Sequence, residues 1–83
     1  MERRILTEEI IDDYRNNLIL QEKRVATIEK YIRDIRAFSV YIQDKTITKE
    51  IVIAYKSHLQ ENYAVRSVNS ILASINSLFA FLN

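Results

Sequence analysis

The stretch Thr27-Ile-Glu-Lys-Tyr-Ile-Arg-Asp-Ile-Arg-Ala-Phe-Ser-Val-Tyr-Ile42 decides the fold of this 83-residue chain. Its apolar side chains recur at steps of three and four, the spacing of one face of an α-helix. They are Ile28, Tyr31, Ile32, Ile35, Phe38 and Ile42. The opposite face carries Lys30, Arg33 and Arg36, with Glu29 and Asp34 as the only acids. We therefore expect one face to join a core and the other to suit an anionic partner.

The same apolar pattern returns forty residues later. The equivalent pairs are Thr27 and Ser67, Ile28 and Val68, Tyr31 and Ile71, Ile32 and Leu72, Ile35 and Ile75, Phe38 and Leu78, Tyr41 and Phe81, and Ile42 and Leu82. We interpret this as two helices with equivalent core-facing stripes. A simpler explanation stays open, because any two amphipathic helices can be slid into register.

The composition narrows the class of protein. The chain has no Gly, Pro or Cys, so it lacks the pairs that β-hairpin turns prefer and cannot form disulfides or thiolate metal sites. We see no apolar run of membrane-spanning length and no signal peptide, and we expect one small cytoplasmic domain. The net charge is only +1. However, residues 23–36 hold five basic and two acidic side chains, whereas the rest holds seven basic and nine acidic. Such segregation can mark a binding face.

Two helices are expected in the first half of the chain. Thr7 is a suitable N-cap, followed by Glu8 and Glu9 at the positive end of the helix dipole. The first apolar stripe consists of Ile10, Ile11, Tyr14, Leu18 and Ile19. We end this helix near Gln21 or Glu22 and place a bend at residues 23–26, although no breaker is present and a single helix over 7–42 stays an alternative. The second helix should end near Gln43 or Asp44.

A third helix follows the polar connector at residues 44–46. Thr48 is the predicted N-cap, with Ile47 and Val52 as a hydrophobic staple. The β-branched run over 51–53 also suits a strand, but the cap and the spacing of Ile51, Tyr55 and Leu59 favour a helix. Asn62 is expected to take the left-handed conformation that usually falls to Gly at a helix end.

The fourth helix is expected from about Arg66 to Leu82. Its apolar stripe is Val68, Ile71, Leu72, Ile75, Leu78, Phe79 and Leu82. The opposite face holds only small or polar residues, namely Asn69, Ser70, Ala73, Ser74, Asn76, Ser77 and Ala80. Such a face allows close approach to another helix or to a nucleic-acid groove.

The order of these features resembles the core-binding domain of tyrosine recombinases, also called phage integrases. The residues that carry the resemblance are Thr27, Ile28, Tyr31, Asp34, Ile35 and Phe38 in the second helix, Ile47, Thr48, Glu50, Tyr55 and Leu59 around the third, and Ser67, Val68, Asn69, Phe79, Phe81 and Leu82 in the fourth. The resemblance implies an all-α, compact four-helix SAM-like domain made of two helical hairpins. It also implies a DNA-binding fragment, residues 1–83, with catalysis in a separate domain and no cofactor or metal. Its partners would be double-stranded DNA and, in the full-length protein, other recombinase protomers.

In that family the second and fourth helices lie at the DNA major groove. The contact residues that this implies here are Lys23, Arg24, Thr27, Lys30, Arg33, Arg66, Ser67, Asn69, Ser70 and Ser74. Lys and Arg would neutralise phosphates, Thr27 and Ser67 would bind them through hydroxyl or backbone N–H groups, and Asn69 could pair with an adenine edge.

Each of these assignments has a simpler alternative. Lys30 and Arg33 would then be solvated and paired with Asp34 or Glu29, and the serines would line a helix–helix contact. We assign Tyr14, Tyr31, Tyr55, Phe38 and Phe79, which sit on the helical core stripes, to the core. His58 has no second metal ligand at a suitable spacing, and we assign it to the surface. As a whole, the chain could instead be a helical protein-interaction module that uses the small polar face of its fourth helix. No residues support an enzyme.

Overall fold

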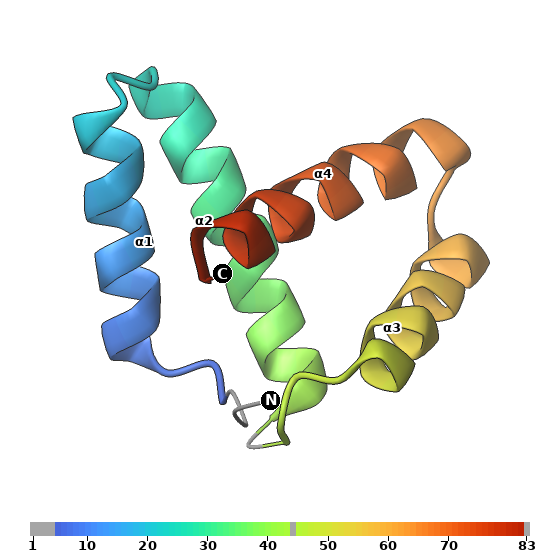
Figure 1. Cartoon of the computed structure of the whole chain (residues 1–83). Helices are drawn as coiled ribbons and strands as arrows, with labels where there is room; N and C mark the ends of the chain where they lie inside the picture. Colours follow the sequence, from blue (N-terminus) through green and yellow to red (C-terminus); the bar gives the residue numbers. More distant parts are fainter. Residues whose placement is uncertain (1–4, 44, 83) are drawn as a thin grey trace.

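The computed structural model describes residues 5–43 and 45–82 and contains four α-helices. They are α1 (Glu8–Leu20), α2 (Val25–Ile42), α3 (Lys49–Asn62) and α4 (Val65–Leu82). Helices α1 and α2 form one hairpin and α3 and α4 form the other (Figure 1). Helix α4 crosses α2, and this crossing is the most extensive contact between helices. The expected all-α domain of two helical hairpins is confirmed.

Two threonines start helices, as predicted. The Thr7 hydroxyl accepts a hydrogen bond from the Ile10 backbone N–H at 3.2 Å, and Thr48 does the same for Ile51 at 3.1 Å. Each cap satisfies one backbone donor that the first helical turn would otherwise leave unpaired. The cap at Thr48 also explains why the β-branched run after it forms a helix.

The turn between α1 and α2 is a Schellman motif without glycine. The Lys23 N–H bonds to the Leu18 carbonyl at 3.2 Å, and the Glu22 N–H bonds to the Ile19 carbonyl at 2.9 Å. In this motif the residue after the C-cap takes the left-handed conformation, and Glu22 does so with φ 58°. The motif ends α1, so the alternative of one long helix over 7–42 is wrong.

The predicted end of α3 is also wrong in detail. Asn62 is still helical, and its side-chain Nδ2 donates to the His58 carbonyl at 2.8 Å. The helix ends with Asn62, and the C-cap residue Tyr63 has an extended backbone with φ −137°. The left-handed conformation is found instead at Glu22 and at Gln43, which follows α2 with φ 54°. Asp44, predicted in the next connector, lies outside the described residues.

The core forms where the apolar faces of all four helices meet. Its buried members are Leu6, Ile11, Tyr14, Leu18, Ile32, Ile35, Phe38, Ile42, Tyr55, Leu59, Val68, Ile75 and Leu78. The predicted stripes of α2 and α4 lie in this core or pack against it. One prediction for the apolar stripe of α1 is wrong, because Ile19 is 53% exposed and does not join the core.

The five aromatic side chains predicted for the core, Tyr14, Tyr31, Phe38, Tyr55 and Phe79, lie in it or pack against it, whereas Tyr63 is 53% exposed. The Phe38 ring lies 5.0 Å from that of Tyr55 and 6.2 Å from that of Phe79, which links α2 to both α3 and α4. Tyr14 and Phe81 link α1 to the end of α4, with ring centroids 5.5 Å apart. His58 is exposed, as predicted, and lies beside the ring of Tyr41.

Among the described residues, one helix is long and apolar enough to cross a membrane by length and composition. This helix is α4, with a mean hydropathy of 1.3. The finding corrects the expectation that the chain has no segment of that kind. Core helices of soluble proteins meet the same criterion, and α4 directs Val68, Ile75 and Leu78 into the core.

Candidate nucleic-acid interface

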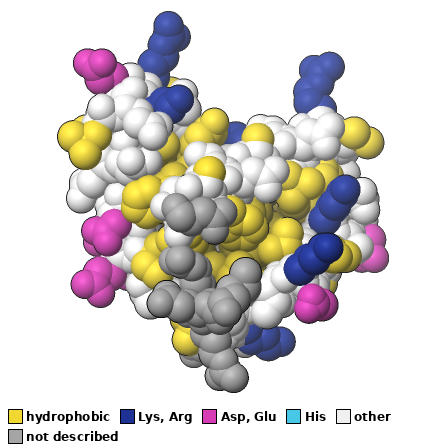
Figure 2. Space-filling model, viewed as in Figure 1, with side chains coloured by type: hydrophobic (Ala, Val, Ile, Leu, Met, Phe, Trp, Pro, Cys, Tyr) yellow, Lys and Arg dark blue, Asp and Glu magenta, His cyan; other side chains and the backbone are white. Residues whose placement is uncertain are grey.

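Basic side chains project from two corners of the molecule. Figure 2 shows Lys and Arg atoms standing out at the upper left and upper right, where Figure 1 places the α1–α2 turn and the start of α4. The basic residues of these two segments are Lys23 and Arg24 in the turn and Arg66 in the first turn of α4, and all three are exposed. The three cations are therefore free to meet an anionic surface.

A shallow pocket lies where α2 and α4 cross. Its walls are Ala26, Thr27, Lys30 and Tyr31 from α2 and Ser70 and Ala73 from α4. These residues recur at steps of three and four on each helix, so they share one face of it. The structure thus brings together three of the predicted contact residues, Thr27, Lys30 and Ser70.

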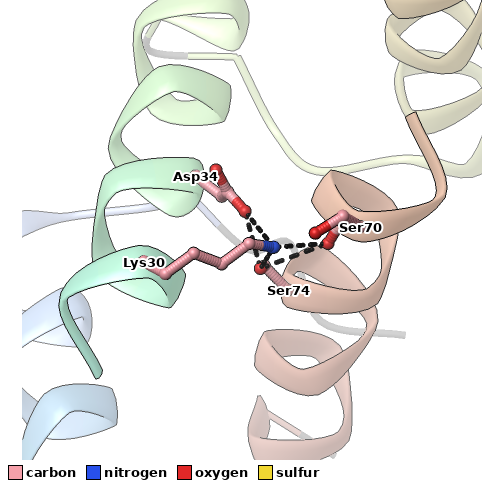
Figure 3. Close-up of polar contacts among 4 residues, drawn as sticks. All are labelled: Lys30, Asp34, Ser70 and Ser74. Atoms are coloured by element: carbon pink, nitrogen blue, oxygen red, sulfur yellow. Dashed lines mark hydrogen bonds and ion pairs between the residues drawn. The ribbon is translucent and has the colours of Figure 1, made fainter. Parts of the chain in front are cut away.

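Lys30 is held at the edge of this pocket by a polar cluster (Figure 3). Its ammonium nitrogen lies 2.7 Å from Oδ2 of Asp34 on the next turn of α2. The same nitrogen donates to the Ser70 carbonyl at 2.7 Å and to the Ser74 hydroxyl at 2.9 Å, both on α4. The Ser74 hydroxyl in turn donates to Asp34 Oδ2 at 2.7 Å. We call Lys30, Asp34, Ser70 and Ser74 the crossing cluster.

The crossing cluster corrects one predicted DNA contact. The Ser74 side chain is 0% exposed and is directed into the α2–α4 contact. In this conformation it is inaccessible to any ligand, so the helix–helix alternative holds for this serine. Small residues on α4 let α2 approach closely here, and the same face serves α1 through a hydrogen bond from Tyr14 to Ser77.

The sequence pattern missed the role of Asp34. Its place opposite the apolar stripe predicted a solvated carboxylate that offsets nearby basic residues. The structure instead buries Asp34 to 8% exposure, with the Lys30 ammonium and the Ser74 hydroxyl as its partners. The predicted alternative for Lys30, a pair with Asp34, is confirmed.

Arg33 lies in a different pocket, between α1 and α2. This pocket is lined by Arg15, Ile28, Glu29, Ile32, Arg33 and Arg36. Arg36 is bonded to Glu8 through two contacts of 2.6 and 2.9 Å. The hydrogen bond from Arg36, and then its positive charge, hold the pKa of Glu8 below its ordinary value, and the same bond raises the pKa of Arg36. The structure therefore separates Arg33 from the contact residues at the α2–α4 crossing.

The other predicted contact residues remain accessible. Ser67, Asn69 and Ser70 are exposed on the first turns of α4, and Thr27 is partly exposed near the start of α2. Of these residues, Thr27 and Ser70 line the α2–α4 pocket. Lys23, Arg24, Arg66, Ser67 and Asn69 add exposed cations, a hydroxyl and one amide on the α1–α2 turn and the first turns of α4. This donor set suits phosphates and base edges.

Comparison with known proteins adds a family assignment. The family model described as phage integrase, N-terminal SAM-like domain, matches residues 11–83. Neither the curated proteins nor the solved structures contain a significant match to the chain. The family match covers α1 from its fourth residue onward and the whole of α2, α3 and α4, so it includes both helices of the α2–α4 crossing.

Proposed function

This chain belongs to the phage integrase N-terminal SAM-like domain family, and on that premise we propose that it binds duplex DNA through α2 and α4. In this role it is the non-catalytic DNA-binding domain of a site-specific tyrosine recombinase that acts in DNA integration and recombination. A separate domain of the longer protein would cut and rejoin the strands.

One observation carries the proposal most directly. Thr27 of α2 and Ser70 of α4 line the same pocket, although forty-three positions separate them in the chain. The crossing thus merges the exposed starts of two helices into one surface, with cations on the flanking segments. A single surface of this kind is what a protein needs to follow a DNA backbone across a groove.

The accessible residues divide into two kinds of contact. Lys23, Arg24 and Arg66 would neutralise phosphates, and Thr27 and Ser67 would add hydroxyl donors. Asn69 carries both a donor and an acceptor on one amide, which is the pattern that reads an adenine edge. Phosphate contacts then supply most of the affinity, and Asn69 supplies base preference.

The cellular setting follows from this role. We expect the recombinase to act in the cytoplasm, on the nucleoid of a prokaryotic cell. Other protomers of the same recombinase would lie beside it on the DNA. The isolated domain should be monomeric, because its proposed partner surface is built for DNA.

The first test is an NMR titration of the ¹⁵N-labelled chain with a short duplex at low salt. Amide shifts should cluster at residues 23–33 and 64–73. Three or four neutralised phosphates predict a slope of about −3 for the log of the affinity against the log of the salt concentration. Shifts confined to α1 or α3, or binding without a salt dependence, would refute the proposal.

A charge-matched pair of variants locates the surface. Replacing Lys23, Arg24 and Arg66 with Gln should remove most of the binding and most of the salt slope. Replacing Lys45, Lys49 and Lys56 with Gln removes the same charge from the α3 side and should change affinity far less. Equal losses in the two variants would indicate attraction by net charge alone.

As a protein-interaction module, the chain would use the small polar face of α4, and less of that face is exposed than the sequence suggested. Ser74 and Ser77 on the small polar face of α4 are occupied by α2 and α1. The exposed remainder includes Asn69, Ala73, Asn76 and Ala80. We therefore assign the closely packed part of this face to the fold and its N-terminal part to DNA.

A further inference from the structure

The crossing cluster places an ion pair inside the contact between the two helices proposed to bind DNA. Lys30 was predicted to neutralise a phosphate. An ammonium group has three N–H donors, and Lys30 has three acceptors at 2.7 to 2.9 Å, one on α2 and two on α4. Its charge is already balanced by Asp34 on the same helix, so a phosphate would have to compete with a carboxylate for it.

The cluster also depends on the register between the helices. Both links join positions forty residues apart, Lys30 with Ser70 and Asp34 with Ser74. If α4 turned by one residue, Ala73 or Ile75 would stand where Ser74 now bonds, and neither has a side-chain donor or acceptor. The surrounding apolar contacts, such as Ile35 with the core, are not directional and tolerate such slips more easily.

We propose that Lys30 and Asp34 are positioning residues for DNA binding, which fix α4 on α2 so that the contact residues of both helices form one surface. This inference rests on the proposed function. It reassigns Lys30 from phosphate ligand to interface element. Buried polar groups have this role in other helical contacts, where one polar pair selects the register.

The decisive variant is Lys30→Met, which keeps most of the unbranched stem and removes the charge. Misplaced helices should weaken DNA binding roughly tenfold, but the slope of log affinity against log salt should equal that of the unaltered protein. A lost phosphate contact would instead reduce the magnitude of the slope by about 1. Arg66→Gln, at an exposed position, is the comparator that should show the reduced slope.

Lys30→Arg gives an independent readout. Arginine keeps the positive charge, but its planar fork cannot place donors on the same three acceptors as an ammonium group. Binding should therefore stay weakened in Lys30→Arg. Restoration of full affinity by arginine would show that charge alone matters and would overturn the inference.

If the Lys30 variants fail to fold, Ser74→Ala still tests the positioning role. It retains both charged residues and removes only the bridging hydroxyl, and circular dichroism would show whether the helices persist. We expect weaker binding with an unchanged salt slope, together with a changed α2–α4 angle in NMR residual dipolar couplings. Unchanged affinity and angle in a folded Ser74→Ala variant would overturn the inference.

The proposed function and the inference fail in different ways. If the unaltered chain shows no salt-dependent binding, DNA binding at this surface is wrong. If it binds and the Lys30→Met slope drops by about 1, DNA binding stands and the positioning role is wrong. If affinity and slope both stay unchanged in Lys30→Met, the cluster is irrelevant to DNA binding.

Discussion

The phenol oxygen of Tyr14 lies 2.7 Å from the hydroxyl oxygen of Ser77 and donates a hydrogen bond to it, which joins α1 to the last turns of α4. The Tyr14 ring is fully buried and packs against Phe81 on the same helix. This contact ties the two hairpins together at the end away from the α3–α4 turn.

Removing this hydrogen bond should cost a modest amount of stability. Tyr14→Phe keeps the ring and its contact with Phe81, and it leaves the half-buried Ser77 hydroxyl able to bond to water. We expect the free energy of unfolding in urea to fall by about 1 kcal/mol. Tyr63→Phe removes an equivalent hydroxyl from a side chain that is 53% exposed, and it should change the stability by less than about 0.5 kcal/mol. Equal effects would show that the bond contributes nothing measurable.

The left-handed turn after α1 offers a stabilising substitution. Glu22 has a φ of 58° in the Schellman motif, a conformation in which a β-carbon is strained and glycine is not. Glu22→Gly should raise the free energy of unfolding by roughly 1 kcal/mol. Gln21→Gly is the matched control, because Gln21 has a φ of −80° and a glycine there only adds freedom to the unfolded chain. The interpretation of the turn would be wrong if both variants lost stability.

Local chemistry explains which parts of the fold were predictable. The caps at Thr7 and Thr48 depend on hydrogen bonds three residues away, and the stripes of α2 and α4 depend on spacing within one helix. Both kinds of signal depend only on residues within one short segment, so they can be recognised in the sequence without knowing the tertiary structure. The α1–α2 turn was harder to predict, because Glu22 occupies a conformation that its own chemistry disfavours and that the surrounding fold imposes.

The candidate site was less predictable for a related reason. A helical-wheel pattern assigns polar residues opposite the apolar stripe to a surface. It therefore predicts a solvated Asp34 and leaves Ser74 between a DNA contact and a helix–helix contact. Their burial depends on each other and on Lys30, which come from two different helices. One signal was present in the sequence. The forty-residue repeat that aligns the two stripes also aligns Lys30 with Ser70 and Asp34 with Ser74.

The stability of the protein should fall in alkaline solution, in part because of Tyr55. Burial, followed by the nearby carboxylate of Asp34, raises the pKa of Tyr55 above its ordinary value of 10.0. Below that value the phenol is protonated in both states and does not affect the pH dependence. Above it the unfolded chain loses the proton first, so stability falls as the pH rises through the folded pKa.

Urea unfolding at a series of pH values from about 8 to 11 would measure this effect, since the window brackets the ordinary tyrosine pKa. Other groups also titrate there, so the quantity to compare is the difference between the unaltered protein and Tyr55→Phe. That difference should be constant up to about pH 9 and should then shift in favour of the variant. A constant difference over the whole range would contradict the assigned pKa direction.

The two ion pairs found within residues 5–43 and 45–82 should differ sharply in their contribution to stability. Asp34 is buried against Lys30, and Asp34→Ala leaves the ammonium group without its counter-charge inside the α2–α4 contact. We expect a loss of about 2–3 kcal/mol. Glu8 and Arg36 pair at the surface, where solvent and salt screen the charges, so Glu8→Ala should cost far less.

The double variant Lys30→Met with Asp34→Leu separates charge burial from packing. Replacing a buried pair with apolar residues of similar volume is often neutral for stability, so the double variant should recover most of what Asp34→Ala loses. If our inference about DNA binding is right, it should not recover the affinity, because the register-selecting bonds to Ser70 and Ser74 are absent. Urea unfolding and a DNA titration on the same samples would measure both quantities. A double variant that is as unstable as Asp34→Ala would show that the loss comes from packing and not from the unpaired charge.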